Sequence, residues 1–145
     1  MYLHRVRNIN HGIVRMDLQY RFMKKEKENG YHEKVFAMGI SKIYPLLIAK
    51  AERKGRTKQE VDTVTCWLTG YTPKELEQRI AENMLYGQFF AEAPQMNPNC
   101  EKITGSICGV RIQEIEDPLM KKIRYLDKLV DELAKGKDLE KILRK

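Results

Sequence analysis

From residue 31 onward, the apolar positions recur mostly at the spacing of amphipathic α-helices. They fall three or four positions apart over residues 40–51, 61–68 and 119–133. This spacing turns one stripe of each helix toward a core. The longest stripe follows steps of four and three: Leu119, Ile123, Leu126, Val130 and Leu133. The pattern predicts a mainly α fold, with five or six helices in a single compact domain.

Helix start signals agree with these stripes. Thr57 and Thr72 each precede a Glu by three residues, the capping-box pattern. Asp117 is followed by Pro and is expected to cap the longest helix. We expect Ser41 to cap the first helix of the regular region, with Pro45 near its first turn, where proline is tolerated.

Residues 103–118 break the helical pattern with two glycines, a serine and a cysteine inside a β-branched run. Residues 107–112 alternate well enough to predict a short strand. A lone strand needs a partner, and the candidate is the segment at residues 34–38, so the fold would hold at most one short strand pair. If the chain has a site, we expect it in or beside this non-helical stretch.

Residues 1–30 differ from the rest. They are Arg-rich and poorly periodic, and residues 24–30 (Lys-Lys-Glu-Lys-Glu-Asn-Gly) are typical of a linker. We interpret residues 1–30 as a basic N-terminal extension or a mis-started leader, and residues 31–145 as a single helical domain.

Composition is that of a soluble globular protein, with 42% hydrophobic and 32% charged residues. No apolar run approaches the roughly 20 residues that span a bilayer, and the N-terminus lacks the apolar core of a signal peptide. We therefore expect a cytoplasmic protein with no membrane partner. Its three cysteines match no zinc spacing and are expected to be free thiols, although Cys100 and Cys108 are spaced so that a disulfide is conceivable.

The net charge of +7 permits nucleic-acid binding, but the charge is concentrated. Residues 1–34 carry +4 and residues 50–58 another +4, whereas the remainder is close to neutral. The second cluster supplies a candidate basic contact surface: Arg53, Lys54, Arg56 and Lys58. Residues 57–84 resemble a helix-turn-helix in outline, but their second helix is acidic and would be repelled by phosphate, so DNA binding is not favoured.

Candidate catalytic groups are few. Cys108 could be a nucleophile, but it needs a base, and the nearest histidine to the domain is His32. Glu114, Glu116 and Asp117 could act as acid and base. Asp117 already has a sufficient role as a helix cap, and no metal site or cofactor motif is evident.

The best candidate ligand-binding group is polar. Asn97, Asn99 and Arg111 have no structural role that the sequence reveals, and Cys108 lies among them. The geometry of this group does not follow from the sequence.

Five blocks in order carry a resemblance to a known family: residues 49–62, Trp67-Leu-Thr-Gly-Tyr71, residues 89–94 with Asn97-Pro-Asn99, residues 103–111, and residues 115–136. Over about residues 31–145 they resemble the small bacterial proteins grouped as domain of unknown function 2200. Residues 1–30 depart from that pattern. The resemblance implies a bacterial cytosolic helical domain and brings no activity, cofactor or catalytic residue.

Three functions remain open at this point. The favoured one is a non-catalytic module that binds a protein or small ligand, between residues 97–111 and the start of the helix at Asp117. The first alternative is a small enzyme using Cys108 or the three carboxylates. The second is a nucleic-acid-binding protein using residues 50–58. The oligomeric state is open.

Overall fold

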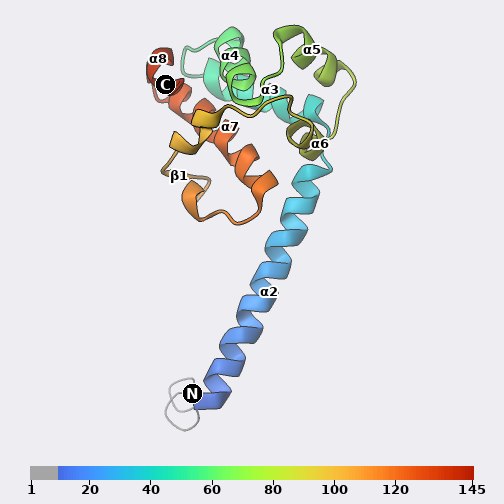
Figure 1. The fold of residues 1–145 in the computed structure, drawn as a ribbon, viewed down its shortest axis with the longest axis vertical. Helices are drawn as coiled ribbons and strands as arrows, with labels where there is room; N and C mark the ends of the chain where they lie inside the picture. Colours follow the sequence, from blue (N-terminus) through green and yellow to red (C-terminus); the bar gives the residue numbers. More distant parts are fainter. Residues whose placement is uncertain (1–9) are drawn as a thin grey trace. The chain divides into compact units, whose positions relative to one another are not determined.

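The computed structural model describes the backbone of residues 10–145 and the side chains from residue 23 onward (Figure 1). Its α-helices are α2 (Asn10–Phe36), α3 (Ile40–Glu52), α4 (Lys58–Thr69), α5 (Pro73–Ala81), α6 (Tyr86–Ala91), α7 (Pro118–Ala134) and α8 (Leu139–Ile142). Two 3₁₀ turns and two strands complete it: η1 (Pro98–Lys102), β1 (Ser106–Ile107), β2 (Val110–Arg111) and η2 (Ile112–Glu114). The described residues confirm the mainly α fold with one short strand pair.

Contacts divide the chain into two compact units, one ending at Val35 and the other running from Phe36 to Lys145. In the first unit, residues 24–30 belong to α2, so the prediction of a linker there is wrong. Lys and Glu are strong helix formers, and this preference outweighs the single Gly30. The part of the predicted extension at residues 1–9 lies outside the described residues.

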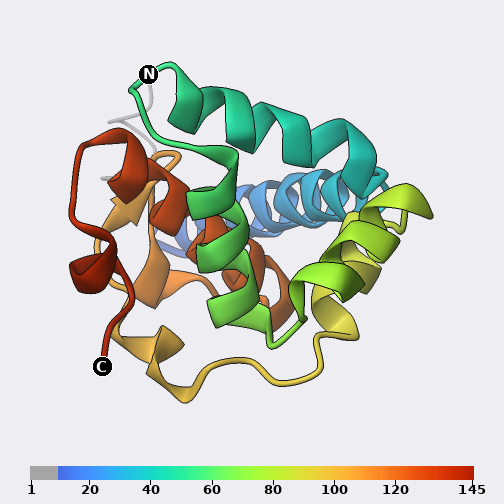
Figure 2. The ribbon, with the colours of Figure 1, turned by 90° about the horizontal axis from the view of Figure 1, so that it is seen from above.

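Helix α7 forms the centre of the second unit. It packs against α3, α4 and α6, and β1 and α8 also contact it. Seen from above, α4 lies in the middle, with α5 and α6 toward one side and the hairpin toward the other (Figure 2). Four of the five residues of the predicted stripe are buried, since Ile123, Leu126, Val130 and Leu133 are at most 2% exposed, whereas Leu119 in the first turn is only partly buried. Burial of this stripe contributes to hydrophobic stabilisation together with the large buried side chains of other helices, among them Phe89 and Phe90.

The predicted caps at three helices are confirmed. Thr57 and Thr72 form complete capping boxes, each accepting from the backbone N–H of the Glu three residues on, at 3.1 Å. Asp117 Oδ1 accepts from the N–H groups of Leu119 and Met120 at 2.9 and 3.2 Å. These caps act within a few residues, so local sequence is enough to define them.

The cap expected at Ser41 is wrong. Helix α3 begins at Ile40, and Asn83, 42 residues away from Ser41, supplies the cap: its Oδ1 accepts from Ser41 N at 3.1 Å and from Ser41 Oγ at 2.5 Å. Gly39 makes room for it, because a Cβ there would lie 2.2 Å from Asn83 Oδ1.

Pro45 lies deeper in α3 than expected, as the sixth residue of the helix. Pro45 and Ser41 are both exposed. Pro45 has no N–H to donate to the Ser41 carbonyl four residues before it, so the helix forgoes that hydrogen bond at an exposed position, where the loss costs least.

The strand pair forms within its own segment, so the partner predicted at residues 34–38 is wrong. β1 pairs antiparallel with β2, and Cys108 and Gly109 between them have φ of 53° and 77°. Two positive φ values give the two-residue turn that matches strand twist. The fold therefore needs no distant strand.

Among the described residues, none of the helices has the length and apolar character needed to cross a membrane.

Candidate functional site

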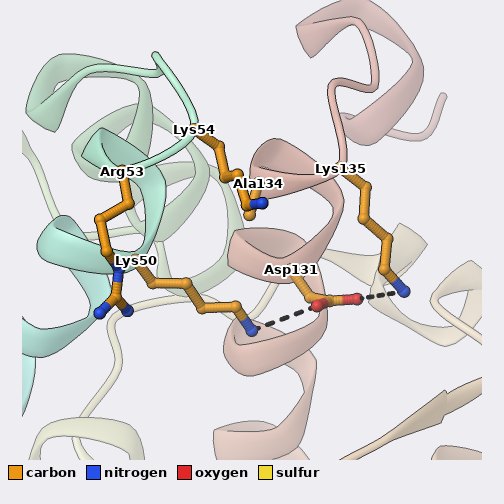
Figure 3. Close-up of a pocket in the computed structure, with 6 residues that line it drawn as sticks. All are labelled: Lys50, Arg53, Lys54, Asp131, Ala134 and Lys135. Atoms are coloured by element: carbon orange, nitrogen blue, oxygen red, sulfur yellow. Dashed lines mark ion pairs between the residues drawn. The ribbon is translucent and has the colours of Figure 1, made fainter.

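An open cleft of about 1000 Å³ lies where the end of α3 meets the end of α7 (Figure 3). Its lining is charged: Lys50, Arg53, Lys54, Asp131, Ala134 and Lys135. Four cations surround one carboxylate. Both helices end here, and cations are favourable near the partial negative charge of a helix C-terminus. That preference explains why lysines gather here, and it leaves the cleft strongly positive.

Asp131 is the central group of the cleft. Its two carboxylate oxygens each hold one ammonium group: Oδ1 lies 3.2 Å from Lys50 Nζ, and Oδ2 lies 3.0 Å from Lys135 Nζ. The Asp131 side chain is only 14% exposed. Burial alone would raise its pKa, but the hydrogen bonds and charges of Lys135 and Lys50 outweigh burial, and the pKa of Asp131 is lowered. Asp131 is therefore a fixed anion.

Arg53 and Lys54 line the α3 side of the cleft and are exposed. Their backbone N–H groups close the end of α3, donating to Ala49 O and Ala51 O. Within the described part of the chain, neither side chain has an ion-pair partner, so both cations are available to a ligand. Figure 3 shows both side chains on the α3 side of the cleft, with the Arg53 guanidinium lower in the view than the Lys54 ammonium.

Arg56, predicted to belong to the contact surface, has a structural role instead. Its Nη1 donates to the carbonyls of Leu133 and Lys137 at 3.1 and 2.8 Å. Its Nη2 and Nε pair with Glu60 Oε2 at 2.6 and 3.1 Å. The Arg56 side chain, 16% exposed, joins the start of α4 to the end of α7. The hydrogen bond from Arg56 is the main cause of the lowered pKa of Glu60.

Lys58 is also engaged, although 55% of its side chain is exposed. Its ammonium lies 2.7 Å from Asp62 Oδ2, and this hydrogen bond is the main cause of the raised pKa of Lys58. Asp62 Oδ1 accepts in turn from the buried Tyr44 hydroxyl at 2.6 Å. The predicted basic surface thus divides into two free cations on the cleft and two that stabilise α4.

Asn97 and Asn99, predicted as ligand-binding residues without a structural role, both have one. Asn97 caps η1, its Oδ1 accepting from Asn99 N at 2.9 Å, and Asn97 N donates to Leu68 O at 2.9 Å. Asn99 Nδ2 donates to Arg144 O at 3.2 Å and so holds the C-terminal segment. None of these bonds involves Arg111.

Arg111 and Cys108 both lie on the exposed hairpin. Among the described residues, the Arg111 guanidinium has no ion-pair partner, and Cys108 Sγ has no hydrogen-bonded base. The structure holds Cys66, Cys100 and Cys108 as free thiols. The hairpin therefore does not gather the predicted group into one site.

The three candidate carboxylates do not act as one group. Asp117 caps α7, as described above, and Glu114 and Glu116 are exposed. Across the residues that the structure describes, no group of three His, Cys, Asp or Glu side chains is placed to hold a metal ion.

Sequence reasoning missed Asp131 and Lys135 as site residues. Asp131 lies in the last turn of α7 and Lys135 directly follows the helix, and this separation by four residues is a detectable signal for an ion pair. Such pairs are common on exposed helices, and only the approach of Lys50 from α3 makes this one part of a cleft.

Comparisons with known proteins give a family. None of the curated proteins is significantly similar to the chain. A solved structure, described as the crystal structure of uncharacterized protein SP1917, is 50% identical with a TM-score of 0.74, and the match covers 77% of this chain and 91% of that one. The family model described as uncharacterized protein conserved in bacteria (DUF2200) matches residues 34–144. The chain therefore belongs to this bacterial family, as the resemblance of its sequence blocks implied.

Proposed function

We propose that this chain is a non-catalytic binding module of the bacterial cytosol, and that its partner or ligand carries negative charge and binds at the basic cleft. The observation that carries the proposal is the arrangement of Arg53 and Lys54, two exposed cations on the rim of a cleft that already holds two more. Clustered charge of one sign in a concave surface attracts ions of the opposite sign.

The lining residues fit binding better than catalysis. Asp131 is a poor general base, because its lowered pKa makes it a weak proton acceptor at neutral pH. Lys50 and Lys135 each hold an ion pair with Asp131. A nucleophilic lysine needs the opposite surroundings, an apolar pocket or another cation that favours its neutral form.

The surface predicted from the sequence, between residues 97–111 and the start of α7, is replaced in this proposal. Asn97 and Asn99 hydrogen-bond within the fold. Arg111 remains exposed on β2, but no lining residue of the cleft belongs to the hairpin. The basic end of α3 offers the more concentrated charge.

Binding of a glutamate-rich peptide, followed by fluorescence anisotropy at low salt, tests the proposal. The double variant Arg53→Gln/Lys54→Gln should bind roughly fivefold more weakly, since two exposed ion pairs contribute about 1 kcal/mol together. The matched control is Lys42→Gln/Lys74→Gln, which removes the same charge from two exposed lysines away from the cleft. Equal losses in the two double variants would show that only net charge matters and would refute a site at the cleft.

A further inference from the structure

We infer that the partner at the cleft is an acidic segment of another protein with several carboxylates, and that Asp131 competes with this segment for Lys50 and Lys135. The inference rests on the proposed function, because it takes binding at the cleft as given. It adds that the partner is a polypeptide, and it assigns a role to Asp131, the carboxylate among the lining residues.

The cleft favours a ligand with several linked charges. The available cations, Arg53 and Lys54, lie on the α3 side, and Lys135 lies on the α7 side with Asp131 between. A single exposed ion pair in water is weak, so a small monovalent anion that reaches one side gains little. A chain with several carboxylates can contact both sides, and each later contact benefits from the first.

The chemistry of the lining favours carboxylate over nucleic acid. Proteins that hold single-stranded nucleic acid stack its bases on aromatic side chains, and none of the six lining residues is aromatic. Duplex DNA is read by an element that enters a groove, whereas this surface is a hollow between two helix ends. The Arg53 guanidinium offers a planar fork that pairs with carboxylate and phosphate alike, so the preference for a polypeptide rests on the absence of an aromatic side chain in the lining.

A peptide also complements the central carboxylate. Each oxygen of Asp131 accepts from one lysine, and a carboxylate oxygen has capacity for a second donor. Peptide backbone N–H groups can supply that donor, whereas a phosphodiester backbone has none. Polar groups of both signs in the cleft therefore match a polypeptide more closely than a nucleic-acid strand.

Asp131 already pairs with Lys50 and Lys135, the two lysines that a ligand carboxylate would otherwise contact. It holds Lys50 and Lys135 in place when the cleft is empty of partner, and its charge opposes each incoming anion. Replacing it with Asn keeps the shape and removes the charge. The Asp131→Asn variant should therefore bind an acidic peptide about threefold more tightly, the size of one screened repulsion between charges several ångströms apart.

The test compares two probes of equal charge, each carrying an uncharged dye: a capped peptide that alternates glutamate and serine and has four glutamates, and an oligothymidylate with four phosphodiesters. Binding of the full chain is measured by anisotropy for the wild type and for Asp131→Asn. Glu77→Gln removes an equal charge from an exposed position on α5 and serves as the matched control. Thermal melting confirms that each variant folds.

The inference expects the wild type to bind the peptide more tightly than the oligothymidylate, and Asp131→Asn, but not Glu77→Gln, to tighten peptide binding. Equal or tighter oligothymidylate binding would overturn it in favour of a nucleic-acid partner. Unchanged or weaker peptide binding by Asp131→Asn would overturn the role of Asp131. Failure of the proposed function looks different, since Arg53→Gln/Lys54→Gln would then weaken peptide binding no more than Lys42→Gln/Lys74→Gln does.

A second variant keeps the inference falsifiable if Asp131→Asn does not fold. Lys135 is 70% exposed, so the fold should tolerate Lys135→Gln. This change should weaken peptide binding about twofold, as the loss of one exposed ion pair. Undiminished binding would show that the α7 side of the cleft does not contact the peptide and would overturn the inference.

Discussion

Replacing Arg56 with alanine should destabilise the fold by about 3 kcal/mol. Arg56 makes two hydrogen bonds to the carbonyls of Leu133 and Lys137 and a fork onto Glu60. Hydrogen bonds to a charged group contribute about 1.5–3 kcal/mol. Because the side chain is still 16% exposed, we take about 1 kcal/mol for each carbonyl bond and about 1 kcal/mol for the fork. The melting temperature should fall by about 10 °C.

Urea denaturation and thermal melting measure this loss. Arg56→Lys should cost about half as much, because an ammonium keeps the charge but cannot reach all three acceptors. Lys58→Ala is the matched control, because Lys58 also pairs with a carboxylate four residues on, that of Asp62. The Lys58 side chain is 55% exposed, so Lys58→Ala should lower the free energy of unfolding by less than about 0.5 kcal/mol. Similar losses for Arg56→Ala and Lys58→Ala would refute the structural role assigned to Arg56.

Three further predictions concern the fold. Gly70→Ala should destabilise by more than about 2 kcal/mol in urea denaturation, because φ is 82° and the new Cβ would lie 2.7 Å from Gln95 O; a near-neutral result would contradict this packing. Asn83→Ala should cost more than about 1 kcal/mol in urea denaturation, because it removes the cap of α3 and places Ala at a φ of 50°; a loss below about 0.5 kcal/mol would contradict the cap. The lowered pKa values of Glu60 and Asp131 stabilise the fold at neutral pH, and this stability should be lost as the pH falls below the ordinary pKa of each group, about 4.5 for Glu60 and about 3.8 for Asp131; a urea midpoint that stays constant down to pH 3 would exclude this.

The elements predicted best are those defined by neighbouring residues. Thr57, Thr72 and Asp117 cap helices through bonds that span two or three residues. The stripe of α7 is also local, because helical spacing alone orients it. The cap of α3 could not be predicted, since Asn83 reaches it from 42 residues away and depends on the absence of a side chain at Gly39.

The site was harder to predict for the same reason. The sequence does not reveal the structural roles of Asn97 and Asn99, because two of their hydrogen-bond partners, Leu68 and Arg144, come from distant elements. The sequence alone does not distinguish Arg56 from the neighbouring surface cations, because the Leu133 carbonyl that it binds belongs to α7, far along the chain. Charge clusters are visible in a sequence, but the residues that neutralise them are set by tertiary packing.

The most direct test of the account is to map where an acidic peptide binds. The ¹⁵N-labelled full chain, titrated with the glutamate–serine peptide, reports each backbone amide in a heteronuclear correlation spectrum. Binding at the basic cleft predicts shifts that concentrate at Lys50, Arg53 and Lys54 on α3 and at Lys135 after α7, and that need about fivefold more peptide to saturate in Arg53→Gln/Lys54→Gln. Shifts that concentrate instead on the hairpin around Arg111 would contradict it.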